Sequence, residues 1–416
     1  MFSSSCPQDP HAPPFTVVTP THSSTPLLVP SPPPPSLPSH DRIPVALLGG
    51  TGLSGRHTFS LLHKHPHFTV AHIIGSPASA GIPFFETWTN KEAKLQAHHS
   101  ALNYEPLPPP PHRPVHGETL PTPTTFETFL QLHTPSSIKY IISTVAPSLA
   151  THLETHLSSL GFTIITISPA NRTPLNTFVL ERSLPSSPLQ IYASPNCVAC
   201  GVTPVLSAIY ANAGQDSINN ITITTIQSLT GRGDSPYPSE LCVGSMLPVG
   251  QLEETETYLQ NELTGLFFSS SSTNSHSPNL DVRCYRGGAL RGHMIDLRIS
   301  LTPSSTLPDP TTLTSSTVIS WLQSFDPLSS YHASARTSTY HITGSSPPIL
   351  VSPSPNGVLQ SSVVGMQVVV TNVSVTSSGC IRCTVIVDNL IKGAAGAAIQ
   401  IMEYVEFQEN LRPWKS

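Results

Sequence analysis

Charged residues are scarce in this chain of 416 residues. They make up 10% of the sequence, and 19 basic against 24 acidic side chains give a formal net charge of −5. A surface that binds nucleic acid needs clustered lysine and arginine. The composition therefore argues against a nucleic acid as partner.

Long hydrophobic runs are missing as well. No apolar stretch reaches the roughly 18 residues that a membrane span requires, so we expect no membrane partner. Residues 1–42 are rich in Pro, Ser, Thr and His, and they lack both the apolar segment of a secretory signal and the Arg enrichment of a transit peptide. We predict a disordered leader over residues 1–42 and a cytoplasmic protein.

The seven cysteines lack the pattern of a disulfide scaffold, since their number is odd and their spacing irregular. Cys380 and Cys383 form a CxxC pair, and such a pair supplies only two of the four ligands of structural zinc. We expect no metal site.

A glycine-rich turn follows the first short apolar run. Val45 to Leu48 has the composition of a buried parallel strand, and Gly50-x-Gly52-x-x-Gly55 follows it directly and opens a helix over residues 56–62. Glycines there let backbone N–H groups approach a pyrophosphate, although a turn made only for packing is the alternative. No acidic residue ends the second strand, residues 70–74; Ser76 and Ser79 stand there, which favours NADP over NAD.

Strands and helices alternate along the first half of the chain. Further strands are expected at 139–142 and 162–167, with leucines at helical spacing over 149–160 between them. This alternation predicts an α/β fold that begins with a Rossmann-like, doubly wound parallel sheet.

The second half has a different pattern. A helix is expected over 202–213, and strands over 221–226, 298–301 and 367–370, which predicts an α+β catalytic and dimerisation domain with a mixed, mostly antiparallel sheet. Three low-complexity stretches are interpreted as surface insertions: 106–125, 269–278, and 302–355 apart from a helix near 318–325. The expected domains are an NADP-binding domain (43–193), the catalytic domain (194–385) and a C-terminal helix returning to the first domain (386–416).

Cys197 follows the turn Ser194-Pro195-Asn196 and precedes a predicted helix. A thiol at a helix N-terminus has a lowered pKa and can attack a carbonyl. The alternative is a buried apolar cysteine. Cys200 lies one turn further along the helix and is expected to be a packing residue.

Arg286 and His293 lie seven residues apart in a glycine-rich segment. In an extended chain such positions can face one cavity from its two ends. An arginine can fix a substrate carboxylate and a histidine can move protons near neutral pH.

Several motifs occur together and in the order found in one enzyme family. They are Gly-Gly-Thr-Gly-x-x-Gly at 49–55, Ser-Pro-Asn-Cys at 194–197, Thr-Ile-Gln-Ser-Leu-Thr-Gly at 225–231, Glu253-Glu254, the segment 286–293, and Asp-Asn-Leu-x-x-Gly-Ala-Ala-Gly at 388–396. By these motifs the chain resembles the aspartate-semialdehyde dehydrogenases, most closely their archaeal and fungal branch. The resemblance covers about residues 43–300 and 356–405.

The resemblance implies a role for each matching residue. Cys197 would be the nucleophile, His293 the general acid and base, and Gln227 the residue that orients the acyl intermediate. Arg286, Glu253 and Glu254 would bind the amino-acid end of the substrate, and Asn196 and Arg172 the phosphate. The residues implied for NADP are Gly49, Gly50, Thr51, Gly52, Leu53, Ser54, Gly55, Ser76, Ser79, Ser143 and Asn389.

The chain departs from the family pattern at two places that bear on charge. Glu256 stands where the family has a lysine that contacts phosphate, so we expect an anion beside the phosphate site; an exposed first turn of a helix is the alternative. The turn Ser76 to Ile82 lacks the basic residues of the family's turn.

The resemblance implies an NADP-dependent enzyme that interconverts L-aspartyl 4-phosphate and L-aspartate 4-semialdehyde, with inorganic phosphate as a reactant and a homodimer or homotetramer as the assembly. Two alternatives stay open. One is a related acyl-phosphate reductase, such as one acting on N-acetyl-glutamyl phosphate or in specialised metabolism. The other is a catalytically impaired homologue.

Overall fold

The computed structural model describes most of the chain from Arg42 to Asn410. The described residues are 42–102, 104–110, 120–185, 187–233, 244–249, 255–268, 278–329, 348–352, 363 and 365–410. Residues 1–41 of the expected leader and the Glu253-Glu254 pair lie outside them. Within these ranges no helix has the length and apolar character that crossing a membrane requires.

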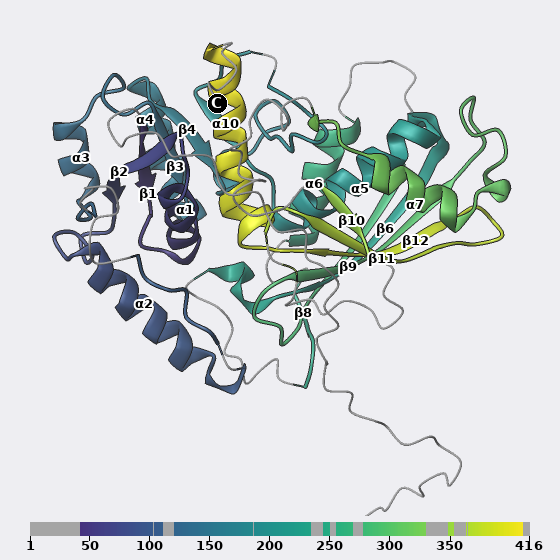
Figure 1. The fold of residues 1–416 in the computed structure, drawn as a ribbon, viewed down its shortest axis with the longest axis horizontal. Coiled ribbons are helices and arrows are strands. Elements are labelled where there is room, and N and C mark those ends of the chain that lie inside the picture. Colours follow the sequence, from purple (N-terminus) through teal and green to yellow (C-terminus); the bar gives the residue numbers. More distant parts are fainter. Residues whose placement is uncertain are drawn as a thin grey trace, which may run out of the picture. The chain divides into compact units, whose positions relative to one another are not determined.

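The first sheet is parallel throughout, as the alternation of strands and helices predicted (Figure 1). Its strand order is β2-β1-β3-β4-β5. The strands are β1 (Ile43–Leu48), β2 (Phe68–Ile74), β3 (Tyr140–Ser143), β4 (Thr163–Thr166) and β5 (Ile191–Ala193). The order reverses between β1 and β3, and the crevice at the carboxyl ends of such strands is where doubly wound sheets bind ligands.

Helices cover both faces of this sheet. On one face Leu47 packs with α1 (Leu53–His63), α2 (Phe84–His98) and the C-terminal helix α10 (Gly396–Asn410). On the other face Leu48 packs with α3 (Phe126–Leu132) and α4 (Pro147–Ser159). Because successive side chains of a strand point to opposite faces, the continuous apolar run of β1 serves both cores.

The second sheet is mixed and mostly antiparallel, which confirms the expected fold class. Its order is β10-β11-β12-β9-β6-β8-β7, with β6/β8 and β10/β11 as the parallel pairs. The strands are β6 (Ile218–Gln227), β7 (Leu247–Pro248), β8 (Asn279–Arg286), β9 (His293–Leu301), β10 (Ile349–Val351), β11 (Val368–Val375) and β12 (Ile381–Val387).

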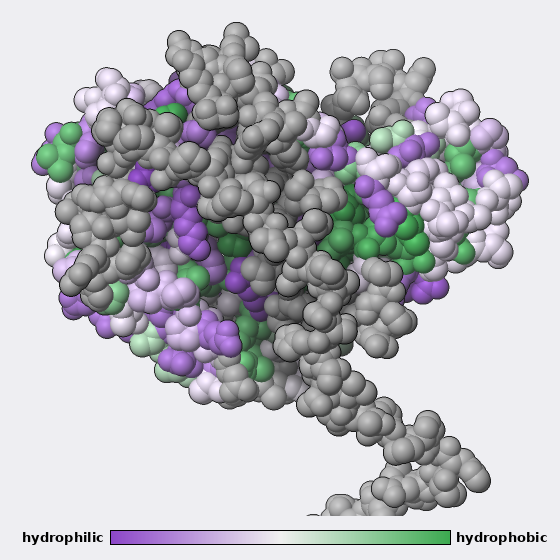
Figure 2. All heavy atoms as spheres, viewed as in Figure 1, coloured by the Kyte–Doolittle hydropathy of each residue, from purple (hydrophilic) through white to green (hydrophobic). Residues whose placement is uncertain are grey.

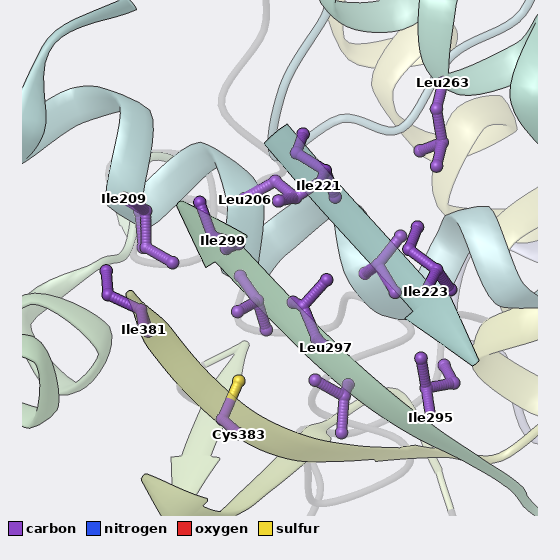
Figure 3. Close-up of a cluster of buried hydrophobic side chains, with 14 of the residues drawn as sticks. Leu206, Ile209, Ile221, Ile223, Leu263, Ile295, Leu297, Ile299, Ile381 and Cys383 are labelled. Atoms are coloured by element: carbon purple, nitrogen blue, oxygen red, sulfur yellow. The ribbon is translucent and has the colours of Figure 1, made fainter. Parts of the chain in front are cut away.

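One face of the mixed sheet is buried by the helices α5 (Cys197–Ala213), α6 (Thr255–Phe268) and α7 (Ser315–Ser324). Figure 3 shows alternate residues of β6 and β9, such as Ile223 and Leu297, lying with Leu206 of α5 and Leu263 of α6. This packing fixes the ends of β6, β8 and β9 relative to the start of α5.

Two parts of the expected surface insertions belong to the sheets. Ile349–Val351 forms the edge strand β10, and Ile349 is buried. Thr124 exchanges backbone hydrogen bonds with Ile73 and Gly75 beside β2. Both segments were wrongly assigned to loops, because pairing with a distant strand leaves little trace in a short, Pro- and Ser-rich stretch.

The surface is mixed in character. In the coloured part of Figure 2, hydrophilic side chains are scattered among residues of intermediate hydropathy, and a larger hydrophobic area lies on the half that contains the mixed sheet. This distribution matches a sequence with 38% hydrophobic and 10% charged residues.

Candidate active site

Cys197 is the first residue of α5, which begins five residues earlier than the sequence predicted. The side chain of Asn196 accepts a hydrogen bond from Ala199 N–H at 2.9 Å and so caps the helix. Cys197 therefore lies where the backbone N–H groups of the first turn point outward. Cys200 is buried against Ser194, 3.6 Å from its Oγ, in agreement with a packing role.

His293 meets Cys197 from the mixed sheet. It is the first residue of β9, and its Nε2 lies 2.9 Å from Cys197 Sγ. Ser228 N–H donates to His293 Nδ1 at 3.0 Å. Because Nδ1 accepts this hydrogen bond, the neutral ring carries its proton on Nε2. Nε2–H is thus the group that the ring presents to the sulfur.

Burial keeps this pair neutral. Burial raises the pKa of the Cys197 thiol to about 12, against the opposing effects of Arg286 and Arg172. Burial and then the charge of Arg286 lower the pKa of His293 to about 3. The expected lowering of the thiol pKa by the helix is outweighed by loss of solvent. Because the thiol is protonated in this environment, its sulfur must lose the proton as it attacks a carbonyl.

Arg286 and Gln227 end two neighbouring parallel strands. They are register partners at the ends of β8 and β6. Arg286 is 1% exposed, and its guanidinium donates to the carbonyl of Ser228 and, at 3.5 Å, to Gln227 Oε1. A Cβ on Gly231 would lie 3.1 Å from Arg286 Nη1 and 3.2 Å from His293 Cε1, so a side chain there would require these groups to shift by a few tenths of an ångström.

A π-helical turn brings the C-terminal segment against the cysteine. Ile391–Ala395 form this turn ahead of α10, and a Cβ on Gly393 would lie 2.5 Å from Cys197 Cβ. Asn389 Oδ1 accepts Gly292 N–H at 2.8 Å, which ties this segment to the start of β9. Turns of this kind occur often at functional sites.

A cavity of about 610 Å³ is lined by residues from the expected catalytic, substrate-binding and cofactor-binding sets. Seven of the expected site residues line it: Ser54, Arg172, Asn196, Cys197, Gln227, Arg286 and Asn389. Thr144, Val145 and Tyr258 line it as well and were not expected. Thr144 and Val145 directly follow β3. Ligands bind at the carboxyl ends of parallel strands, so this position in the sequence could have predicted them. His293 reaches the site through Cys197.

The glycine turn has the form of a nucleotide cradle. Gly49 has φ of +81°, and a Cβ on Gly55 would lie 2.5 Å from Gly49 O, so side chains there would fill the turn. Gly52 at the N-cap of α1 brings no side chain to cap the first turn, and that turn contains no acidic residue. A pyrophosphate therefore fits at this helix N-terminus. Gly50, Thr51 and Leu53 belong to the same turn.

Three other expected cofactor residues lie around this crevice. Ser76 and Ser79 form the turn after β2, where Ser79 Oγ donates to Ser76 O at 3.0 Å. Ser143, at the end of β3, is fully buried, and its hydroxyl donates to Glu154 at 2.6 Å. That hydroxyl is engaged with α4.

The expected position of Glu256 was wrong. Its carboxylate accepts Cys284 N–H at 2.9 Å and lies 3.5 Å from Arg283, so it faces β8. The residues of α6 that line the cavity are Thr255 and Tyr258. A different residue of α6, Glu262, contacts an expected phosphate residue: its carboxylate forms a 2.8 Å ion pair with Arg172.

Known structures share this architecture at low sequence identity. Aspartate-semialdehyde dehydrogenase with NADP from Candida albicans has a TM-score of 0.67 and 17% identity over 88% of this chain and 99% of that one. Aspartate-semialdehyde dehydrogenase II of Vibrio cholerae, complexed with ASA, has a TM-score of 0.63 and 17% identity over 88% and 98% of the two chains. The chain has the fold of the aspartate-semialdehyde dehydrogenases.

Curated relatives include a dehydrogenase and a reductase. An aspartate-semialdehyde dehydrogenase of Methanothermobacter thermautotrophicus is 23% identical over 251 residues, which are 60% of this chain and 68% of the relative. A malonyl CoA reductase (NADP) of Metallosphaera sedula is 24% identical over 267 residues, 60% and 67% of the two chains. No model of a known protein family matches the chain.

Proposed function

We propose that this protein is an NADP-dependent oxidoreductase that interconverts an aldehyde and an activated carboxylic acid through a thioester on Cys197. The observation that carries the proposal is the contact of 2.9 Å between Cys197 Sγ and His293 Nε2 at the wall of a cavity that Ser54 of the glycine turn also lines. The two reductive relatives support the same class of reaction.

In this reaction Cys197 Sγ adds to the carbonyl carbon of the aldehyde and forms a thiohemiacetal. As Sγ adds, His293 Nε2–H gives its proton to the carbonyl oxygen and takes up the thiol proton in exchange, so the adduct carries a hydroxyl group. Hydride then leaves the same carbon for the cofactor and the hydroxyl proton is released to solvent, which yields the thioester. The bound cofactor supplies or accepts the hydride. Arg286 holds the carboxylate of the substrate, since a buried arginine beside the nucleophile can pair with it.

The proposed aldehyde is L-aspartate 4-semialdehyde. The dehydrogenases that share the fold support it. The sequence motifs imply phosphate as the acyl acceptor, but the 2.8 Å ion pair between Arg172 and Glu262 disfavours a second anion at that place. The expected homodimer or homotetramer stays a prediction.

A burst experiment tests the thioester without any acyl acceptor. L-Aspartate 4-semialdehyde and NADP, mixed with stoichiometric enzyme, are expected to give up to one NADPH per active site and an acyl adduct on Cys197 by mass spectrometry. Cys197→Ser supplies the control without a thiol. The proposal would be refuted if neither the burst nor the adduct appears in an enzyme that, without aldehyde, is shown to bind NADP normally.

A further inference from the structure

The cation expected to bind phosphate already has a carboxylate partner inside the protein. Arg172 Nη1 lies 2.8 Å from Glu262 Oε1, and Nη2 donates to Ile167 O at 2.6 Å. The side chains of Arg172 and Glu262 are 11% and 8% exposed. An ion pair removed from solvent in this way opposes the entry of a second anion, which would have to displace Glu262.

Glu262 also takes the backbone donor that a phosphate would use. Its second oxygen, Oε2, accepts Asn196 N–H at 2.6 Å, directly before the nucleophile. The carboxylate thus bridges the guanidinium and the start of α5, two groups that otherwise attract phosphate. An internal anion occupies the place where an acyl phosphate would need its positive partners.

The charges that line the cavity do not compensate for this. Among the described residues that line it, the basic ones are Arg172 and Arg286, and Arg286 is assigned to the substrate carboxylate. With Arg172 paired to Glu262, the site balances a substrate with one negative charge. A substrate with a carboxylate and a phosphate dianion exceeds that balance.

Arg172 and Glu262 both line a second cavity. Its volume is about 230 Å³, and Pro169, Arg172 and Tyr258 border both cavities. Apart from the paired Arg172 and Glu262, its described lining is uncharged, with Pro174, Leu266 and Asn261 among its residues. Such a lining suits a neutral chain that carries amide groups.

We propose that the acyl acceptor is a neutral thiol on a pantetheine-type arm, and that Glu262 excludes phosphate. This inference rests on the proposed thioester on Cys197. The acceptor thiol attacks the thioester carbonyl, the bond from that carbon to Cys197 Sγ breaks, and the thiol proton passes to Cys197 Sγ. The product is a free acyl thioester, and no redox change accompanies the transfer.

The rate of steady NADPH formation that follows the burst, measured with different acyl acceptors, tests the proposal. With L-aspartate 4-semialdehyde and NADP, coenzyme A or pantetheine is expected to support steady NADPH formation at least about tenfold faster than inorganic phosphate at equal concentration. Mass spectrometry should find the acyl thioester. Phosphate as the better acceptor, or no acceleration by either thiol, would overturn the proposal.

Two variants on the same helix separate the role of Glu262 from a general effect. Glu262→Gln keeps the shape and the acceptor for Asn196 N–H but removes the charge, so the phosphate-dependent rate should rise about tenfold. Glu256→Gln, whose side chain faces β8, is the matched control and should leave that rate unchanged. An unaltered phosphate response in Glu262→Gln rules out exclusion by Glu262.

Binding measurements test the choice of acceptor without any aldehyde. In Cys197→Ala, which cannot form the thioester, calorimetric titration should detect pantetheine and find no competition from millimolar phosphate. Glu262→Gln in the same background should gain phosphate binding. Tight phosphate binding by Cys197→Ala with Glu262 intact would contradict the exclusion of phosphate. A failed burst would instead contradict the proposed function, so the two outcomes can be told apart.

Discussion

At the scale of single residues, the two cysteines of α5 differ in what they can reach. Cys197 lies against His293 and borders the cavity, whereas Cys200 is 1% exposed and lies against Ser194. One helical turn therefore separates the proposed nucleophile from a packing position.

Cys197→Ala is expected to abolish turnover and to leave NADP binding close to that of the wild type, because the dinucleotide is assigned to the glycine turn. Cys200→Ala should keep most of the activity. Steady-state rates and NADP titrations on both variants test this. Equal loss of activity in both, or an active Cys197→Ala, would remove Cys197 as the nucleophile.

At the scale of elements, the ends of strands and helices make the site. Gln227, Arg286 and His293 lie at the ends of β6, β8 and β9, and Cys197 begins α5. The π-helical turn closes this arrangement at Gly393. Such positions tolerate little change in backbone, because several elements must keep their contacts at once.

Gly393→Ala tests the contact between the π-helical turn and α5. The added Cβ would lie 2.5 Å from Cys197 Cβ and 2.9 Å from its Cα, so one of the two segments must shift. We expect at least a tenfold loss of kcat and a loss of unfolding free energy of about 1–3 kcal/mol. Gly265→Ala on α6, whose Cβ would make ordinary contacts of 3.5 Å with Pro174, is the control for stability. Wild-type kcat in Gly393→Ala would contradict the packing argument.

The turn after β2 bears on the choice of cofactor. Ser76 and Ser79 stand at the strand end in place of a carboxylate, so NADP should bind at least about tenfold more tightly than NAD, or about 1.4 kcal/mol. Fluorescence titration with both nucleotides measures the ratio. Ser76 is exposed on this turn, and Ser76→Asp should make NAD bind more tightly than NADP. Equal affinities of the wild type for NADP and NAD would refute the prediction.

At the scale of the whole molecule, buried histidines link stability to pH. Burial, followed by the charges of Arg291 and Arg56, lowers the pKa of His57 to about 3. The pKa of His293 is lowered in the same way. Below pH 6.5 the unfolded chain binds protons at these residues and the folded chain does not, so stability falls as the pH falls from about 6.5 toward 3.

His57→Gln isolates one of these groups. From pH 7 to pH 5 the wild type should lose about 2 kcal/mol of unfolding free energy through His57, and the variant should lose that much less. Urea unfolding at the two pH values measures the difference. His152→Gln, an exposed position on α4, should retain the wild-type loss. An equal loss in His57→Gln and the wild type would show that His57 is protonated in the fold.

The sequence by itself determined much of the architecture and the identity of the candidate chemical groups. The run at Val45 to Leu48 and the glycines after it predicted a strand, a nucleotide turn and a helix, since periodicity and glycine spacing are local properties. The motifs also drew attention to Cys197, Gln227, Arg286 and His293, which the fold brings to one site.

Only the tertiary structure decided which charges face one another. Glu256 and Glu262 are indistinguishable as acidic residues of one helix, yet Glu256 faces β8 and Glu262 holds Arg172. Likewise a helix N-terminus predicts a lowered thiol pKa, whereas burial raises the pKa of Cys197 to about 12. Burial and ion pairing depend on segments that lie far apart in sequence and meet only when the chain folds.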